Sequence, residues 1–189
     1  MSVIKVLEDL YGKILSEESK IKLEKAFNVV NYKKDEILLQ QGEICTKFIL
    51  IKKGIIRLFY YKDGRDITEH FSTEYEFVFA IESLFCKKPT ELMIEALEDS
   101  EVYEIAYDEL LRLCSTATDI SKLYQRILEF DLVISQKKAD SWRFESSRER
   151  YERFSAEYPE VVRRASIAHI ATYLLMTPET LSRVRAGTL

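Results

Sequence analysis

The spacing of apolar residues divides the chain into a helical start, a β-rich middle and a helical end. Up to about Asn28 the apolar positions follow helical spacing, with Ser16 as a candidate cap. The middle consists of short runs rich in β-branched and aromatic residues, and its Asp63-Gly64 dipeptide tolerates the positive φ of a tight hairpin. These features predict an antiparallel sandwich or jelly roll. The predicted strands are VVNY, EILL, KFILI, GIIRLFYY, DITEHF, FVFAI, LMIEAL and EVYEI.

A long helix is predicted after these strands. Residues 118–145 contain neither Gly nor Pro, and such a helix would extend roughly 40 Å at ~1.5 Å per residue. Its apolar stripe recurs in steps of three and four, as in a coiled-coil seam, although Lys137 and Asp140 make the later turns polar. The pattern favours a parallel dimer through residues 120–145 over a helix packed only on its own β-domain. The stripe residues are Ile120, Leu123, Tyr124, Ile127, Phe130 and Ile134.

The last part of the chain is typical of a charged helix followed by two helices joined by a tight turn. The charged helix covers residues 148–158, and Pro159 marks its end. Thr177, Pro178 and Glu179 form a strong helix start, because Thr caps, Pro is tolerated at the first position and Glu favours the positive end of the helix dipole. The residues expected to face inward are Ile167, Ile170, Ala171, Leu174, Leu181 and Val184.

The second of these helices has a polar face, which suits a recognition helix in the major groove of DNA. Arg183 is the first choice for base readout, because Arg donates two hydrogen bonds to guanine, and Glu179 can accept one from cytosine. The alternative is an ordinary amphipathic helix with a solvated polar face. The apolar inner positions, the length of the turn, the helix cap and the polar residues all match a helix-turn-helix at once, which favours DNA recognition. The predicted DNA-binding residues are Thr177, Glu179, Thr180, Ser182, Arg183, Arg185, Arg163 and Arg164.

The charge of the chain is unevenly distributed. The net charge is −4, but seven Arg and five Glu from Arg148 onward leave +2 there, so the first 147 residues carry −6. Phosphate binding needs such local cations rather than a basic whole protein. No apolar run approaches the ~20 residues that span a bilayer, so we expect a cytoplasmic protein without a membrane partner. The cysteines are odd in number and widely spaced, and we interpret them as buried thiols rather than redox groups: Cys45, Cys86 and Cys114.

Several longer stretches carry a family resemblance, namely YKKDEILLQQGE, FILIKKGIIRLFYYKDGRDITEHF, ALEDSEVYEI and IAHIATYLLMTPETLSRVR. With these, the chain resembles a Crp/Fnr-type transcription regulator, particularly the short form common in Bacteroidetes bacteria. The resemblance implies an α+β fold with a cyclic-nucleotide-binding-like β-roll in residues 1–117, a dimerisation helix in 118–145 and a helix-turn-helix domain in 146–189. We therefore expect a homodimer that binds palindromic double-stranded DNA, and RNA polymerase is a candidate partner.

Two features depart from the family pattern of the helix-turn-helix. Leu175 stands where the turn usually has Gly, and a bulky residue at positive φ would cost about 1 kcal/mol. The sequence also stops soon after Arg185, without room for the two-stranded wing of many relatives, so either the wing is absent or the sequence is truncated. By resemblance, Glu179 and Arg183 still match base-reading positions.

The ligand pocket departs further from the family. Cyclic-nucleotide binders of this fold use a Gly-Glu pair and an Arg beside Ser, Thr or Ala, whereas the stretch here is FVFAIESLFCKKPTELMIEAL. A cyclic phosphate without that Arg would lose its charge-assisted contacts, so we expect cyclic AMP not to bind tightly. Lys87 and Lys88 are candidates for holding an anion, although a solvated loop is the commoner explanation. The effector is left open, and the candidate pocket residues are Glu76, Glu82, Thr90 and Glu91.

Two other functions are alternatives. A cupin-like metal enzyme normally needs several His and carboxylate ligands, and this chain has only His70 and His169. Haem binding by His70 is open, but a strand histidine with a structural partner is commoner. No nucleophile with its base and no Gly-rich phosphate loop is evident, so we expect neither an enzyme, a metal site nor an iron-sulfur cluster. The second alternative is a small-molecule sensor without DNA binding.

Overall fold

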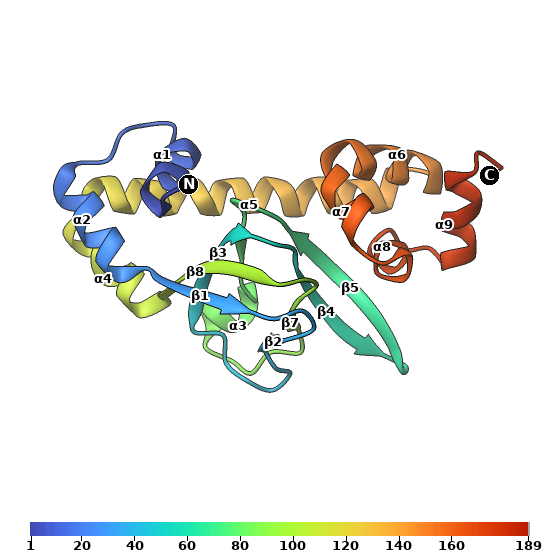
Figure 1. The fold of residues 1–189 in the computed structure, drawn as a ribbon, viewed down its shortest axis with the longest axis horizontal. Coiled ribbons are helices and arrows are strands. Elements are labelled where there is room, and N and C mark those ends of the chain that lie inside the picture. The colour runs from blue at the N-terminus through green and yellow to red at the C-terminus, as the bar shows by residue number, and fades with distance from the viewer. Residues whose placement is uncertain (189) are drawn as a thin grey trace.

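The structure, a computed structural model, describes residues 1–188 and has an α+β fold (Figure 1). Within these residues the strands form two four-stranded antiparallel sheets, in the orders β1-β8-β3-β6 and β2-β7-β4-β5. Every run predicted as a strand contains one, which confirms the antiparallel β-domain. The strands are β1 (Asn28–Tyr32), β2 (Ile37–Leu39), β3 (Lys47–Lys53), β4 (Ile56–Lys62), β5 (Arg65–Ser72), β6 (Phe77–Val78), β7 (Met93–Ala96) and β8 (Ser100–Ala106).

Two turns depend on left-handed backbone. Asp63 and Gly64 have φ angles of 52° and 73° in the β4–β5 hairpin, as the dipeptide predicts. Gly54, just before β4, has a φ of 117°, and a Cβ there would lie 2.1 Å from Oγ of Ser100. Only glycine fits this close approach between the β3–β4 turn and β8.

Short helices pack at one end of the β-domain against the long helix α5 (Thr118–Phe144). Ser16 caps α2 as predicted, because its hydroxyl accepts a hydrogen bond from the backbone N–H of Ser19 at 3.2 Å. The 27 residues of α5 pass along the β-domain and reach the C-terminal helices (Figure 1). The short helices are α1 (Val3–Tyr11), α2 (Glu17–Ala26) and α4 (Tyr107–Thr116), and α3 (Ile81–Cys86) follows β6.

The two halves of α5 have different surroundings. Ile120, Leu123 and Ile127 are buried in the core of the protomer's own β-domain. The first half therefore packs on the β-domain of its own protomer. The sequence pattern had favoured a dimer contact for this half instead. The second half differs, because it exposes the apolar side chains Phe130, Leu132, Val133 and Phe144.

The C-terminal unit is built from short helices around a second core. The charged helix ends just before Pro159, as predicted, and Pro159 then begins a further helix at a position where proline is tolerated. The prediction that Ile167 faces inward is wrong, since its side chain is 37% exposed, but the other predicted inner residues are buried. The helices are α6 (Ser147–Glu157), α7 (Pro159–Arg164), α8 (Ile167–Tyr173) and α9 (Pro178–Arg185).

The second core includes residues of the β-domain. The ring of Phe71 in β5 lies 6.0 Å from that of Phe154 and 5.4 Å from that of Tyr173, measured between ring centroids. Beside it, the backbone N–H of Thr68 donates to Oγ1 of Thr172 in α8 at 3.1 Å. This core joins residues on both sides of the expected boundary before residue 146. The division of the chain into three domains therefore stays a prediction.

The cysteines and the helix lengths bear on two further expectations. Cys45 is buried and Cys114 is half-buried, but Cys86 is exposed, so the interpretation of three buried thiols is wrong for Cys86. Within residues 1–188, no helix is both long enough and apolar enough to cross a membrane.

Candidate nucleic-acid interface and internal cavities

Helices α8 and α9 form a compact helix-turn-helix, as predicted. Each helix has a side-chain cap, because Ser166 accepts a hydrogen bond from the N–H of His169 at 3.1 Å and Thr177 accepts one from the N–H of Thr180 at 3.2 Å. Ala171 is fully buried, and its small side chain allows the two helices to cross closely. The predicted start of α9 is therefore confirmed.

The polar residues of α9 are available to an outside partner. No ion pair among residues 1–188 engages Arg183 or Arg185. The pKa of Glu179 is lowered by its own backbone N–H and by the Thr177 hydroxyl, so its carboxylate is charged near neutral pH. Strong hydrogen-bond donors and an acceptor thus stand side by side on one helix. The exposed members of this face are Thr177, Glu179, Ser182, Arg183 and Arg185, and Thr180 is half-buried.

The turn between α8 and α9 contains a strained residue. Leu175 has a φ of 55°, which is the left-handed conformation expected from its place in the turn. Its side chain is 55% exposed, so packing contributes little to offset the backbone strain. The turn is closed by the N–H of Met176, which donates to the carbonyl of Ala171 at 2.8 Å.

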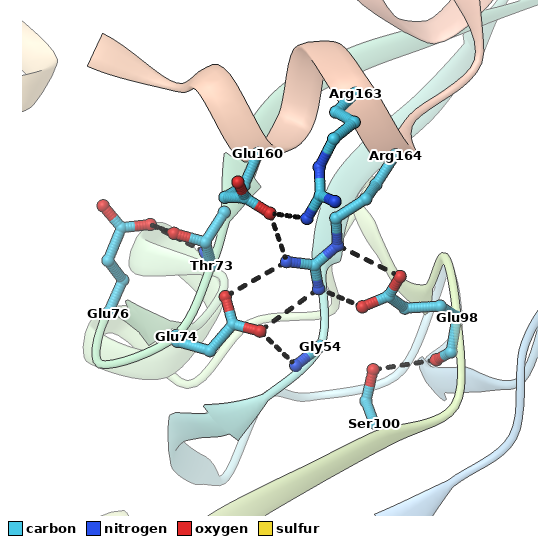
Figure 2. A network of polar contacts seen from close by, with 9 residues as sticks. All are labelled: Gly54, Thr73, Glu74, Glu76, Glu98, Ser100, Glu160, Arg163 and Arg164. Atoms are coloured by element: carbon cyan, nitrogen blue, oxygen red, sulfur yellow. Dashed lines mark hydrogen bonds and ion pairs between the residues drawn. The ribbon is translucent and has the colours of Figure 1, made fainter.

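The two arginines of α7 have different surroundings (Figure 2). Arg163 is exposed and pairs with Glu160 of the same helix. Arg164 instead reaches the β-domain, where its guanidinium pairs with Glu98 and lies 3.1 Å from Glu74. Arg164 therefore holds α7 against the β-domain, and it does not stand on the open surface that its predicted phosphate contact requires.

Two adjoining cavities lie between the β-domain and α5. Their volumes are about 360 and 370 Å³, and both are bordered by His70, Phe77, Asp131 and Ile134. The first is lined mainly by apolar side chains, including Leu58, Phe79, Ile81, Leu92, Ala139 and Trp142. The second extends to α1 and to the turn between β5 and β6, and its border includes Leu10, Glu74, Tyr75, Glu76, Arg126 and Phe130.

Burial perturbs several titratable groups around these cavities. Asp131 makes no hydrogen bond or ion pair within residues 1–188, and burial raises the pKa of its carboxyl group. Burial also raises the pKa of Glu76, although the N–H of Thr73 donates to its carboxylate at 2.7 Å. Burial and the charge of Lys138 lower the pKa of His70 to about 4, so its imidazole is neutral near pH 7.

The basic groups near the cavities already have carboxylate partners. The Lys138 ammonium lies 2.6 Å from Oε1 of Glu69, and Arg126 pairs with a carboxylate of the next helical turn. Lys87 and Lys88 border neither cavity, and Lys87 pairs with a carboxylate of α4. These positions agree with the solvated loop rather than with an anion site at the two lysines.

The predicted pocket residues are only partly brought together. Glu82 borders the first cavity and Glu76 the second. Thr90 and Glu91 border neither, because Thr90 is buried in its own turn and Glu91 binds Gln41 at 2.7 Å. The prediction is therefore wrong in joining these two residues to the cavity wall.

Sequence reasoning missed the two polar residues that the cavities share. His70 was considered only as a haem ligand or a structural histidine, and Asp131 was not considered. A signal for Asp131 was present, since Ile127, Asp131 and Ile134 follow helical spacing on one face of α5. An acidic residue in an apolar stripe indicates a polar contact or a cavity.

Comparisons with known proteins agree with this architecture. Residues 29–117 match the cyclic nucleotide-binding domain family, whereas no curated protein matches the chain. FixK2 from Bradyrhizobium japonicum is 21% identical, with a TM-score of 0.69 over 85% of this chain and 83% of its own. The c-di-GMP responsive global regulator CLP of Xanthomonas campestris is 16% identical, with a TM-score of 0.70 over 91% of each chain. A putative Crp/Fnr-family transcriptional regulator from Eubacterium rectale is 18% identical, with a TM-score of 0.69 over 92% of this chain and 83% of its own.

Replacing Leu175 with Gly should stabilise the protein by about 0.5–1 kcal/mol. The substitution removes the strain of the left-handed backbone, and this gain is partly offset by the greater entropy of glycine in the unfolded chain. Urea unfolding measures the change. Leu175→Ala is the control, because alanine keeps the strain, and an equal gain with alanine would contradict this explanation.

Replacing Arg164 with Gln should loosen the C-terminal unit from the β-domain. We expect faster amide hydrogen exchange in α7 and α8 and a loss of about 1–2 kcal/mol in the free energy of unfolding, since two carboxylates lose a partly buried partner. Arg163→Gln removes only an exposed pair and should cost under about 0.5 kcal/mol. Equal effects of the two substitutions would show that Arg164 does not hold the units together.

Proposed function

We propose that this chain, which has the fold of Crp/Fnr-type transcription regulators and contains a cyclic nucleotide-binding domain, is a dimeric, sequence-specific DNA-binding regulator. The observation that carries the proposal is the exposed polar face of α9. Arg183 supplies a two-pronged donor for guanine, and Glu179 supplies an acceptor for a cytosine amino group. Both project from a helix whose inner face is buried, so their positions relative to the rest of the unit are fixed.

The dimer is supported by the second half of α5. Positions 130, 133, 137, 140 and 144 recur in steps of three and four, which is the spacing of a two-stranded coiled-coil seam. Three of them carry exposed apolar side chains, namely Phe130, Val133 and Phe144. The predicted interface of residues 120–145 thereby becomes shorter, because the earlier stripe residues belong to the protomer's own core.

The dimer explains how a short recognition helix achieves specificity. Two copies of α9 held about 34 Å apart would read the two halves of a palindromic site in successive major grooves. The cavities beside α5 are the proposed effector site, since they lie where the β-domain meets the dimer helix. An effector that binds the two arrangements of the dimer differently would change DNA affinity by linkage.

The alternatives fit less well. The structural likeness is to transcription regulators and extends through the helix-turn-helix, which supports the expectation that the chain is not an enzyme. A sensor without DNA binding would have no need for unpaired arginines on a capped, rigid helix.

The DNA-reading roles are tested by selecting bound fragments from the organism's genomic DNA and measuring affinity for the selected site. Arg183→Ala should relax the preference at one base pair of each half-site and cost about 1–3 kcal/mol. Arg163→Ala should weaken binding to all sequences and reduce the salt dependence by about one phosphate contact per protomer. A wild-type protein that shows no preference among genomic fragments would overturn the proposal.

The dimer seam is tested by sedimentation velocity at micromolar concentration. Val133→Glu should convert the dimer to a monomer, since it places two like charges in an apolar seam. Val133 borders neither cavity, so the effector site is left intact. Ile14→Glu is the control, because Ile14 is 81% exposed and lies outside α5. A monomeric wild-type protein, or a dimeric Val133→Glu variant, would contradict the seam.

A further inference from the structure

We propose that the cavities between the β-domain and α5 bind an apolar ligand that carries a protonated amine, with its ammonium group held by Asp131 and His70. This inference rests on the proposed function, in which these cavities form the effector site. It names a class of ligand opposite in charge to a cyclic nucleotide.

The size and lining of the cavities favour an apolar body for the ligand. The first cavity, of about 360 Å³, falls in the range of small-molecule sites, which are usually apolar with a few converging polar groups. Its walls come from both sheets and from α5, and Trp142 is among the α5 residues that border it. A ligand that buries its hydrocarbon part here gains free energy in proportion to the apolar area removed from water.

Asp131 supplies an anionic group that lacks a partner. It borders both cavities, and among residues 1–188 no donor satisfies its carboxylate. Asp131 is half-buried, so its carboxylate is partly removed from water, and a cationic group placed beside it is favoured. Asp131 shares its helix face with Ile127 and Ile134, which pack toward the β-domain. The seam residue Phe130 borders the second cavity, but its side chain is apolar and supplies no cation for Asp131.

His70 supplies a second acceptor on the border of the same two cavities. Its imidazole borders both cavities with Asp131 and is neutral near pH 7, so one ring nitrogen can accept a hydrogen bond. A primary ammonium group has three donor hydrogens, which suits a carboxylate and an imidazole placed together. The Lys138 ammonium, which borders the first cavity, already pairs with Glu69 and so leaves Asp131 without a basic partner.

The remaining charges around the cavities oppose an anion. Two basic residues border them, Arg126 and Lys138, and both already pair with carboxylates. A cyclic phosphate would meet the carboxyl groups of Glu76 and Asp131, which burial perturbs, and no unpaired guanidinium group among the bordering residues. The acidic residues at the border are Asp9, Glu69, Glu74, Glu76, Glu82 and Asp131.

Fluorescence of the full-length protein provides a direct test, because Trp142 is the only tryptophan of the chain and borders the first cavity. The probes are 4-phenylbutylamine, the neutral 4-phenylbutanol and the anionic 4-phenylbutyrate, which share one apolar body. We expect the amine to change the emission saturably and to bind about tenfold or more tightly than the carboxylate. Equal affinities, tighter binding of cyclic AMP, or no binding of the amine would overturn the proposal.

Asp131→Asn separates the charge from the shape of the site. The amine should lose about tenfold in affinity, whereas the affinity for the alcohol should be unchanged, which also shows that the variant is folded. Asp108→Asn is the matched control, since Asp108 is an exposed residue of α4 that lies outside the seam and borders neither cavity. An unchanged amine affinity in Asp131→Asn would overturn the role of Asp131.

Selection of genomic DNA by the ligand-free protein distinguishes the two proposals. If DNA is selected but the amine does not bind, only the ligand class fails. If the amine binds but no DNA is selected, the regulator function fails and the cation site stands.

Discussion

The contact of Phe71 with Phe154 and Tyr173 is the interaction on which the arrangement of the chain depends. Phe154 belongs to α6 and Tyr173 to α8, so one residue of β5 holds two helices of the C-terminal unit. Phe71 and Phe154 are each 1% exposed, and aromatic pairs contribute about 0.5–1.5 kcal/mol beyond the burial of their area. The orientation of the helix-turn-helix relative to the β-domain is therefore part of the fold and is not left to a flexible linker.

A polar network links α7 to the turn between β5 and β6 at the second cavity. Glu74 borders the second cavity, while its carboxylate binds Arg164 and the N–H of Gly54. The next residue, Tyr75, has a φ of 73° and also borders the cavity. A ligand in that cavity and helix α7 thus contact the same strained turn. Linkage between an effector and DNA requires such a shared element, in addition to a difference in affinity between two arrangements.

The sequence was sufficient for those features that depend on local residues. Short runs of β-branched and aromatic residues located the strands, and the hydroxyl caps Ser16 and Thr177 located helix starts, because both signals act within a few residues. The strain at Leu175 was expected from the family resemblance, which places Gly at that position of the turn. These predictions needed no knowledge of what packs against what.

Features that depend on distant contacts were not predictable in the same way. Nothing in the local sequence distinguishes Arg164 from its exposed neighbour Arg163. The partners of Arg164, Glu74 and Glu98, lie far away along the chain. The apolar stripe of α5 is likewise continuous in sequence, although Ile127 faces the β-domain and Val133 faces solvent. Periodicity identifies a buried face, but it does not say which surface buries it.

The charged residues that border the cavities all come from one protomer, and the two faces of α5 explain how they would keep their surroundings in a dimer. Successive residues of a helix point about 100° apart, so Val133 stands on the seam while Ile134 borders both cavities. A second copy seated on the seam would bury apolar side chains without neutralising Asp131. The carboxylates that disfavour a cyclic phosphate would therefore act in the dimer as they do in the monomer. The proposed ligand would thus differ from a cyclic nucleotide in its charge, in a domain that keeps a cavity of the size of small-molecule sites.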